Sequence, residues 1–356
     1  MKRQIEAALN CVCALLGFIV VCLVIARVDS RDISGISAKV RNFRQQRKKI
    51  DILFVGSSRV FHGIAPKIFD RTLREHGYDW HSFNAGMDGM NPAEEQALVR
   101  QLLACHPPRL KYIFFEFQSD PAAGTPIHDN EVQERDVYWR DLPALVAGLR
   151  KFAIGFSSSL PSTFGSRFSL GRLRYFAPLL SADTRLWFRN FSHGGRGVDL
   201  LATLSSKKPS AMHDPAAADY GYLRGYKDGF FPMDTPLSGE ILTKYREAFA
   251  EMEKNRQAKL AEPVMQDQLR RFAKAMTARR IRVAFILPPA VIGNPGDEIN
   301  APPGTLLLAY DNVARYPELY AEENRLDRQH LNGRGAELFS RQLALDFLRA
   351  LDSDRR

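Results

Sequence analysis

The chain has 356 residues, and its 45% hydrophobic and 25% charged content is that of an ordinary globular protein, which argues against disorder of the whole chain. The formal net charge of +10 suggests a nucleic-acid partner, but much of the excess lies in residues 27–49, and no RNP, zinc-finger or helix-turn-helix pattern accompanies it. We therefore expect no nucleic-acid partner and attribute the basic stretch to attraction to anionic lipid headgroups. The four cysteines have no metal-ligand spacing, and the sequence indicates no metal and no cofactor.

An apolar segment follows a short N-terminal tail, residues 1–6. Residues 7–26, AALNCVCALLGFIVVCLVIA, contain no charged side chain. About 20 residues at about 1.5 Å each span the roughly 30 Å hydrocarbon core of a bilayer. A signal sequence cleaved near Ala26 is the alternative, but its apolar region is usually only about 7 to 15 residues long. We favour a single-pass membrane anchor, followed by a basic juxtamembrane linker at residues 27–49.

The chain next alternates strand and helix patterns. Residues 51–55, DILFV, predict a strand, and residues 59–76 a helix-rich segment. Residues 81–89 begin as a short strand and end in a glycine-punctuated loop, residues 92–104 predict a helix with proline in its first turn, and residues 110–117 predict a second strongly apolar strand. This order predicts an α/β fold with a parallel sheet between two helical layers.

Residues 121–235 interrupt this alternation, and we interpret them as a largely helical insertion over the sheet edge where ligands enter. The domain, residues 50–352, then consists of two core segments, 50–120 and 236–352. The second segment predicts a long polar helix over 239–279 that is interrupted near Pro263, strands at 281–290 and 305–311, and a terminal amphipathic helix over 333–351.

Three residues carry a pattern typical of nucleophilic catalysis. Ser58 follows the first strand, and a serine hydroxyl is a weak nucleophile unless a base takes its proton. His330, just before the last helix, is the candidate base, and Asp327 can reach its Nδ1 across a tight turn. That hydrogen bond fixes the tautomer that leaves Nε2 facing the serine. Ser58 is thus the candidate nucleophile, His330 the general acid/base and Asp327 the orienting carboxylate.

Each of these residues also has a plain structural interpretation. Ser57 and Ser58 are suited to capping the helix after the first strand, and for these serines alone capping is favoured. Asp327 is equally suited to a turn, and an isolated histidine such as His330 usually lies on the surface. The occurrence of all three at predicted sheet-edge positions favours the catalytic interpretation.

The ordered blocks resemble the SGNH/GDSL hydrolase superfamily. The blocks are VGSSR at residues 55–59, NAGMDG at 84–89, and the Asp-x-x-His pair Asp327 and His330. The resemblance implies a flavodoxin-like three-layer α/β fold in which Ser58 attacks an ester carbonyl. It also implies that the backbone N–H groups of Ser58 and Gly89 stabilise the oxyanion. The G-x-S-x-G pattern of α/β-hydrolases is absent around Ser58.

One block departs from that family. Where the family has Gly-x-Asn-Asp, with the Asn completing the oxyanion hole, this chain has FFEFQSD at residues 114–120. The side-chain donor is then Gln118, or Asn84 or Asn91 from the preceding loop, or it is missing.

Two further residues near Ser58 have open roles. Arg59 either binds a substrate carboxylate or pairs with an acidic neighbour, and the sequence favours neither. His62, one helical turn after Ser58, either points toward the pocket or lies on the cleft rim, and the rim is the favoured interpretation.

With its N-terminal anchor, the chain resembles the membrane-bound branch of this superfamily more than it resembles a secreted lipase. That branch modifies cell-envelope polysaccharides and includes alginate O-acetyltransferase-like proteins. That resemblance implies an esterase or O-acyltransferase acting on acyl groups, most simply O-acetyl groups, of an acylated glycan. Its partners would be the lipid bilayer, the glycan and an acyl-donor membrane protein. The alternative is an inactive SGNH-like module that binds polysaccharide or an assembly partner at the membrane. A nucleotide-binding fold is disfavoured because GSSRVF lacks the second glycine of G-x-G-x-x-G.

The resemblance implies an extracytoplasmic, periplasmic domain. The basic residues 27–49 oppose that orientation, because the positive-inside rule would keep the side that follows the span in the cytoplasm.

Overall fold

The computed structural model forms two compact units, residues Met1–Ser34 with Ala123–Asp219, and Gly35–Ala122 with Tyr220–Arg356. Most of the predicted insertion, and with it its expected helical character, falls outside the described residues. The structure describes residues 2–28, 36–90, 92–118, 226–254, 263–291 and 301–355, together with a few positions between 145 and 188.

The first unit contains the helix α1, Lys2–Val28, which includes most of the predicted tail as well as the apolar segment. Its stretch Arg3–Val21 is long and apolar enough to cross a membrane, and α1 is the one helix among the described residues that meets this criterion. Large apolar side chains such as Leu9 and Leu15 are exposed. The length and apolar composition of α1 are those that a membrane-spanning helix requires.

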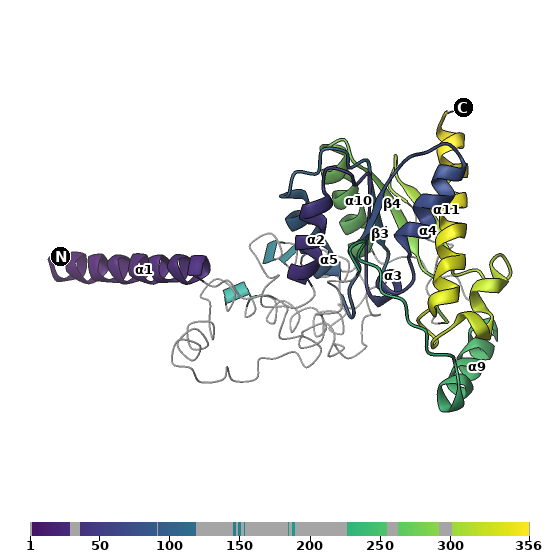
Figure 1. Ribbon diagram of the computed structural model, residues 1–356. Coiled ribbons are helices and arrows are strands. Elements are labelled where there is room, and N and C mark those ends of the chain that lie inside the picture. Colours follow the sequence, from purple (N-terminus) through teal and green to yellow (C-terminus); the bar gives the residue numbers. More distant parts are fainter. Residues whose placement is uncertain are drawn as a thin grey trace, which may run out of the picture. The chain divides into compact units, whose positions relative to one another are not determined.

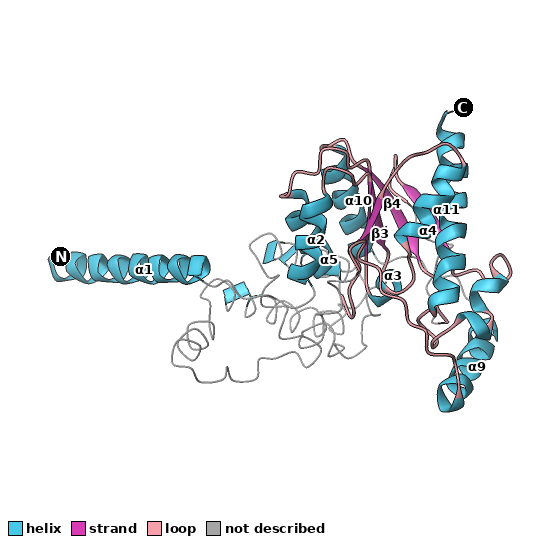
Figure 2. Ribbon diagram, in the orientation of Figure 1, coloured by secondary structure: helices cyan, strands magenta, loops and turns pink. Residues whose placement is uncertain are grey.

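The second unit is built on a five-stranded parallel sheet with the order β2-β1-β3-β4-β5. This order is one of the two common orders of doubly wound sheets. The strands are drawn in magenta in Figure 2, where β3 and β4 are labelled. Each strand falls within a segment that the sequence predicts to be extended. The strands are β1, Ile52–Val55; β2, Ser82–Asn84; β3, Tyr112–Glu116; β4, Arg282–Leu287; and β5, Leu306–Ala309.

Helices cover both faces of the sheet, which confirms the predicted α/β architecture (Figure 1). Phe69 of α4, Pro66–Glu75, stacks on Phe347 of α11, Gly333–Arg355, over one face. On the other face, Phe272 of α10, Pro263–Thr277, packs against Phe115 of β3. The remaining elements are α2, Ile36–Gln46; α3, Ser58–Phe61; α5, Pro92–Leu103; α9, Gly239–Lys254; and the short 3₁₀ helices η5, Pro317–Tyr320, and η6, Glu322–Asn324.

Helix α2 corrects the predicted domain boundary, because it lies within residues 27–49, which the sequence analysis assigns to a linker. Ile36 and Phe43 are buried, and the Phe43 ring packs edge-on against Phe83 of β2. Their spacing of seven residues places both on one helix face. Two basic side chains between them, Lys39 and Arg41, hide this short apolar stripe. The α/β unit therefore begins before residue 50.

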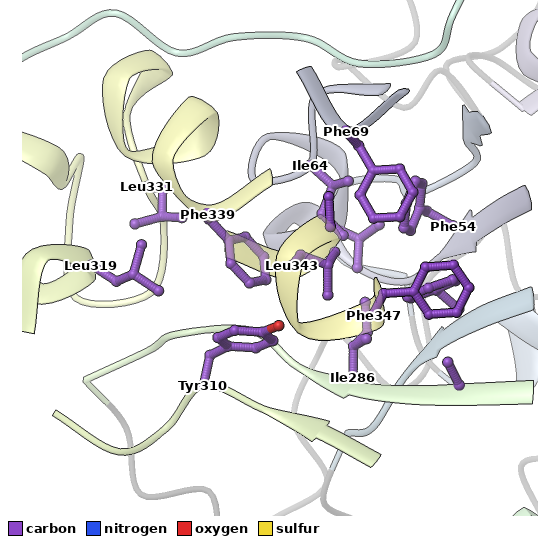
Figure 3. Close-up of a cluster of buried hydrophobic side chains, with 14 of the residues drawn as sticks. Phe54, Ile64, Phe69, Ile286, Tyr310, Leu319, Leu331, Phe339, Leu343 and Phe347 are labelled. Atoms are coloured by element: carbon purple, nitrogen blue, oxygen red, sulfur yellow. The ribbon is translucent and has the colours of Figure 1, made fainter. Parts of the chain in front are cut away.

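A hydrophobic core lies between the sheet and the α4–α11 layer (Figure 3). Phe54, Phe114 and Ala284 pair in register across β1, β3 and β4, so their side chains form one row on that face. Phe347 of α11 covers this row, and its ring centroid lies 5.0 Å from that of Phe114 and 4.9 Å from that of Tyr112. The sheet and α11 are thus locked together by aromatic packing.

We predict that Phe347→Ala lowers the free energy of unfolding by about 3–5 kcal/mol, because it opens a cavity in the middle of this cluster. Asp352→Ala, on the exposed side of the same helix, should change it by less than about 0.5 kcal/mol. Urea unfolding of the full chain in mild detergent measures both. Equal effects of the two substitutions would show that α11 does not seal this core.

Candidate active site

The candidate site lies where β1 and β3 end, at the point where the strand order reverses direction. Ligands of open α/β sheets bind at this edge. Gly56 makes the turn after β1, and a Cβ at this position would meet the Val60 side chain and lie 2.7 Å from Glu116 Cβ. Only glycine lets the chain pass this close to β3. This requirement explains why the apolar strand ends in glycine.

A buried carboxylate fixes the turn that presents Ser58. Glu116, the last residue of β3, accepts a hydrogen bond from the Ser57 N–H at 2.5 Å and one from the Ser57 hydroxyl at 3.2 Å. Arg59 lies on the other side, with its Nε 2.7 Å from Glu116 Oε1. Ser57 also caps α3, because its Oγ accepts from the Arg59 N–H at 3.3 Å. Ser58 is therefore held on both sides by residues bound to one carboxylate.

A tight turn between η6 and α11 presents His330. The Leu326 N–H donates to the His330 carbonyl at 3.0 Å, and Asp327 Oδ1 accepts from the backbone N–H groups of Gln329 and His330 at 2.6 and 2.8 Å. The aspartate therefore shapes the turn as well as facing the ring.

The fully buried Arg325 stabilises this turn through hydrogen bonds to backbone carbonyl oxygens. Its guanidinium donates to the carbonyl oxygens of Asp327 at 3.3 Å, Arg328 at 3.0 Å and Pro289 at 3.1 Å. Pro289 follows β4, so Arg325 ties the turn to the same sheet edge. Planar guanidinium donors suit several carbonyls at once, which a lysine could not match.

The structure brings Ser58, His330 and Asp327 together. Ser58 Oγ lies 2.7 Å from His330 Nε2, and His330 Nδ1 lies 2.9 Å from Asp327 Oδ2. Because a carboxylate only accepts, the ring donates from Nδ1, and its Nε2 is free to accept the Ser58 hydroxyl proton. The His330 side chain is 20% exposed, so a substrate can approach it. The arrangement can deprotonate a serine hydroxyl.

Hydrogen bonding sets the charge of Asp327. Burial alone would raise its pKa, but the His330 ring and the N–H groups of Gln329 and His330 outweigh burial and lower the pKa from 3.8 to about 2. Asp327 is therefore a carboxylate at neutral pH and can balance a positive charge on His330.

Two predicted oxyanion side chains have other roles, which corrects the sequence analysis. The Asn84 amide is fully buried and donates to the carbonyl oxygens of Val60 and Ile64, each at 2.7 Å. The Gln118 amide donates to the Met90 carbonyl at 3.0 Å and to Glu95 Oε1 at 2.5 Å. Both groups stabilise the fold around the site and have no N–H left for a substrate.

The third candidate, Asn91, lies outside the described residues. Gly89 has a φ of 58° in the loop 85–90. Among the described residues, neither the Ser58 nor the Gly89 N–H has a hydrogen-bond acceptor. These two backbone groups remain the candidate oxyanion donors.

Arg59 pairs with an acidic neighbour, which is one of the two roles that the sequence left open for it. Its side chain is only 10% exposed, and Glu116, its partner, is fully buried. A second buried acid, Glu95, lies near this pair, and burial followed by the Glu116 charge raises its pKa well above 4.5. Residue type alone could not reveal this network, but a glutamate inside the apolar strand LKYIFFEF was a signal for it.

His62 is buried rather than exposed on a rim, and it forms a pair that the sequence analysis did not identify. Its Nε2 lies 2.8 Å from Asp88 Oδ1, and its ring centroid is 6.3 Å from that of His330. Within the described residues, no group of three or more His, Cys, Asp or Glu side chains could hold a metal ion.

We predict that Asp327→Asn lowers stability at neutral pH by about 1–2 kcal/mol, less than for a fully buried group because 35% of the Asp327 side chain is exposed. Since the folded pKa of Asp327 is depressed, its stabilising contribution exists above pH 4 and is lost as the pH falls toward about 2. Urea unfolding from pH 2 to 7 should show that the difference in free energy of unfolding between wild type and variant decreases as the pH falls toward about 2. A difference that stays constant with pH would contradict the depressed pKa of Asp327.

No protein-family model matches the chain, and no curated protein matches it. The geometry of the site is therefore the basis for its interpretation.

Proposed function

We propose that this chain is a membrane-anchored SGNH-type serine esterase or O-acyltransferase that acts on acyl groups, most simply O-acetyl groups, of a cell-envelope polysaccharide. The observation that carries the proposal is the 2.7 Å contact between Ser58 Oγ and His330 Nε2, with Asp327 behind the ring. The flavodoxin-like strand order and the position of Ser58 after β1 support the SGNH resemblance. The apolar helix α1 supports an anchor and, with the resemblance, an extracytoplasmic domain.

The first half-reaction would form an acyl-enzyme. His330 Nε2 takes the Ser58 proton as Oγ bonds to the ester carbonyl carbon, and the carbonyl oxygen becomes an oxyanion. When the intermediate collapses, the bond to the leaving alkoxide breaks, and His330 returns its proton to that oxygen. The Asp327 carboxylate stabilises the charged imidazole throughout.

Backbone donors would stabilise the oxyanion. The Ser58 N–H belongs to the first turn of α3, and the Gly89 N–H lies in the loop 85–90 beside the nucleophile turn. Where single donors of this kind have been removed from enzymes, rates fall by about 10²–10³-fold.

The second half-reaction decides between the two activities. His330 takes a proton from an acceptor hydroxyl, whose oxygen attacks the acyl carbon and releases Ser58 Oγ, which regains a proton from His330. Water as the acceptor gives an esterase, and a sugar hydroxyl gives an acyltransferase. An acyl-donor membrane protein would load Ser58 in the second case.

A second candidate function is an inactive module that binds polysaccharide or an assembly partner at the membrane. The observation that favours it is that the amide groups of Asn84 and Gln118 bond within the fold, so neither of these two candidates is free to donate to an oxyanion. The two functions differ in whether Ser58 is chemically activated.

We predict that a fluorophosphonate probe labels Ser58 of the full chain in mild detergent. Ser58→Ala should abolish the labelling, and His330→Ala should slow it by about 10³-fold or more, because the hydroxyl then has no base. Labelling rates and a peptide map of the adduct measure this.

Exposed residues of the same types give the controls. Ser353→Ala and His76→Ala change exposed residues of α11 and of the end of α4, each of which bonds to the carbonyl four residues earlier, and both variants should label at the wild-type rate. Absence of labelling in a folded wild-type chain would reject the serine enzyme and favour the binding module.

A further inference from the structure

Three ionisable side chains other than those of the candidate catalytic residues Ser58, His330 and Asp327 contact the loop 85–90 or belong to it. They are Lys39 of α2, His62 at the end of α3, and Asp88 of the loop itself. Gly89, which the proposed function assigns to the oxyanion, lies in this loop.

Lys39 is a fully buried lysine whose ammonium group is bound entirely by carbonyl oxygens. Its Nζ donates to Gly86, to Gly229 at 2.9 Å and to Asn84 at 3.3 Å. The same Nζ lies 3.9 Å from the centroid of the Phe61 ring. One side chain therefore joins α2 to the loop after β2, to α3 and to the segment that begins at residue 226.

The charge on Lys39 is partly balanced by nearby carboxylates. Burial lowers the pKa of Lys39 well below 10.5, and the charges of Asp88 and Asp228 oppose this effect. A buried ammonium with three acceptors uses all three of its protons. Its removal would leave three carbonyl oxygens without this donor.

His62 links the loop to the segment that follows residue 226. Its Nδ1 lies 2.8 Å from the Phe231 carbonyl oxygen, and its Nε2 lies 2.8 Å from Asp88 Oδ1. A carbonyl and a carboxylate oxygen are both hydrogen-bond acceptors, so each ring nitrogen of His62 faces an acceptor. Burial would raise the pKa of Asp88, but the hydrogen bond and charge of His62, with the charge of Lys39, lower it below 3.8.

The loop 85–90 lies directly against the nucleophile turn. The Met87 N–H donates to the Gly56 carbonyl at 3.0 Å, and a Cβ on Gly86 would lie 2.6 Å from the Phe61 backbone nitrogen. Gly89 follows in the left-handed region, with a φ of 58°. A small shift of this loop would therefore move Gly89 relative to Ser58.

We propose that Lys39, His62 and Asp88 form one positioning network that holds the loop 85–90 against the turn of Ser58, and that α2 is therefore part of the active-site unit. The effect on reaction rate rests on the proposed function, whereas the effect on the loop does not. Helix α2 follows the apolar helix α1 in the chain, after residues 29–35. If the network is correct, activity requires α2 in addition to the sheet and its loops.

Lys39→Met and His62→Gln test the proposal in the full chain in mild detergent. Both should reduce the maximal rate of fluorophosphonate labelling by about 10- to 100-fold, without changing the probe concentration that gives half the maximal rate, because the oxyanion donor is displaced. Both should also speed amide hydrogen exchange in peptides that cover residues 84–90. Arg44→Met, on the exposed side of α2, and His76→Gln, at the end of α4, should match wild type in both measurements.

A double-mutant cycle separates a shared role from two independent ones. If His62 and Asp88 act as one unit, His62→Gln with Asp88→Asn should slow labelling no more than the stronger single variant. If instead the fold reductions in labelling rate of the two single variants multiply in the double variant, the two residues act independently and the proposal of one network is wrong.

The labelling rate and the amide hydrogen exchange together distinguish failure of this inference from failure of the proposed function. Wild-type rates and unchanged exchange at residues 84–90 in Lys39→Met would overturn the inference, whether or not Ser58 is an active nucleophile. Faster exchange in the variants of a wild-type chain that does not label would support the network and reject the serine enzyme.

Discussion

The hydrogen bond between Ser58 and His330 joins residues that are 272 positions apart, and the proposed chemistry depends on it. Neither residue is placed by local sequence alone. A parallel sheet brings the ends of its strands to one edge, so the turn after β1 and the turn tied to the end of β4 by Arg325 meet there. The aromatic packing of α11 on the sheet fixes the second turn, which directly precedes that helix. Core packing and the candidate chemistry are therefore parts of one constraint.

Buried charge surrounds this hydrogen bond. Glu116 with Arg59 lies beneath the nucleophile turn, Arg325 beneath the histidine turn, and Lys39 beneath the loop 85–90. Burying a charge is costly unless it is paired and hydrogen-bonded, and each of these groups has several partners. Their stabilising value is modest after desolvation, but they restrict each backbone segment to a narrow range of positions. We infer that the fold uses these charges to fix geometry, since apolar packing alone would leave the polar turns free to shift.

The sequence predicted the strands well because parallel strands buried on both faces are short apolar runs, as in DILFV and IRVAFILPPA. It also placed Ser58 and His330 at the same edge, because chain order and parallel pairing determine which loops meet there. It failed for Asn84 and Gln118, whose side chains bond to groups that only the folded chain brings near. For Arg59 it left the ion pair with an acidic neighbour as one of two alternatives. It failed for Lys39 too, since a basic residue in a basic stretch gives no sign that it is buried. Polar side chains have many alternative partners, and spacing along the chain does not select among them.

The central claim is that Ser58 carries an acyl group during turnover, with His330 as its base. Intact-mass analysis of the full chain, mixed rapidly with an activated acetyl ester such as p-nitrophenyl acetate, tests it most directly. We expect one added acetyl group per chain, located on Ser58 by fragmentation, and none in Ser58→Ala or His330→Ala. Acetylation elsewhere with unmodified Ser58, or equal ester turnover by wild type and Ser58→Ala, would contradict it.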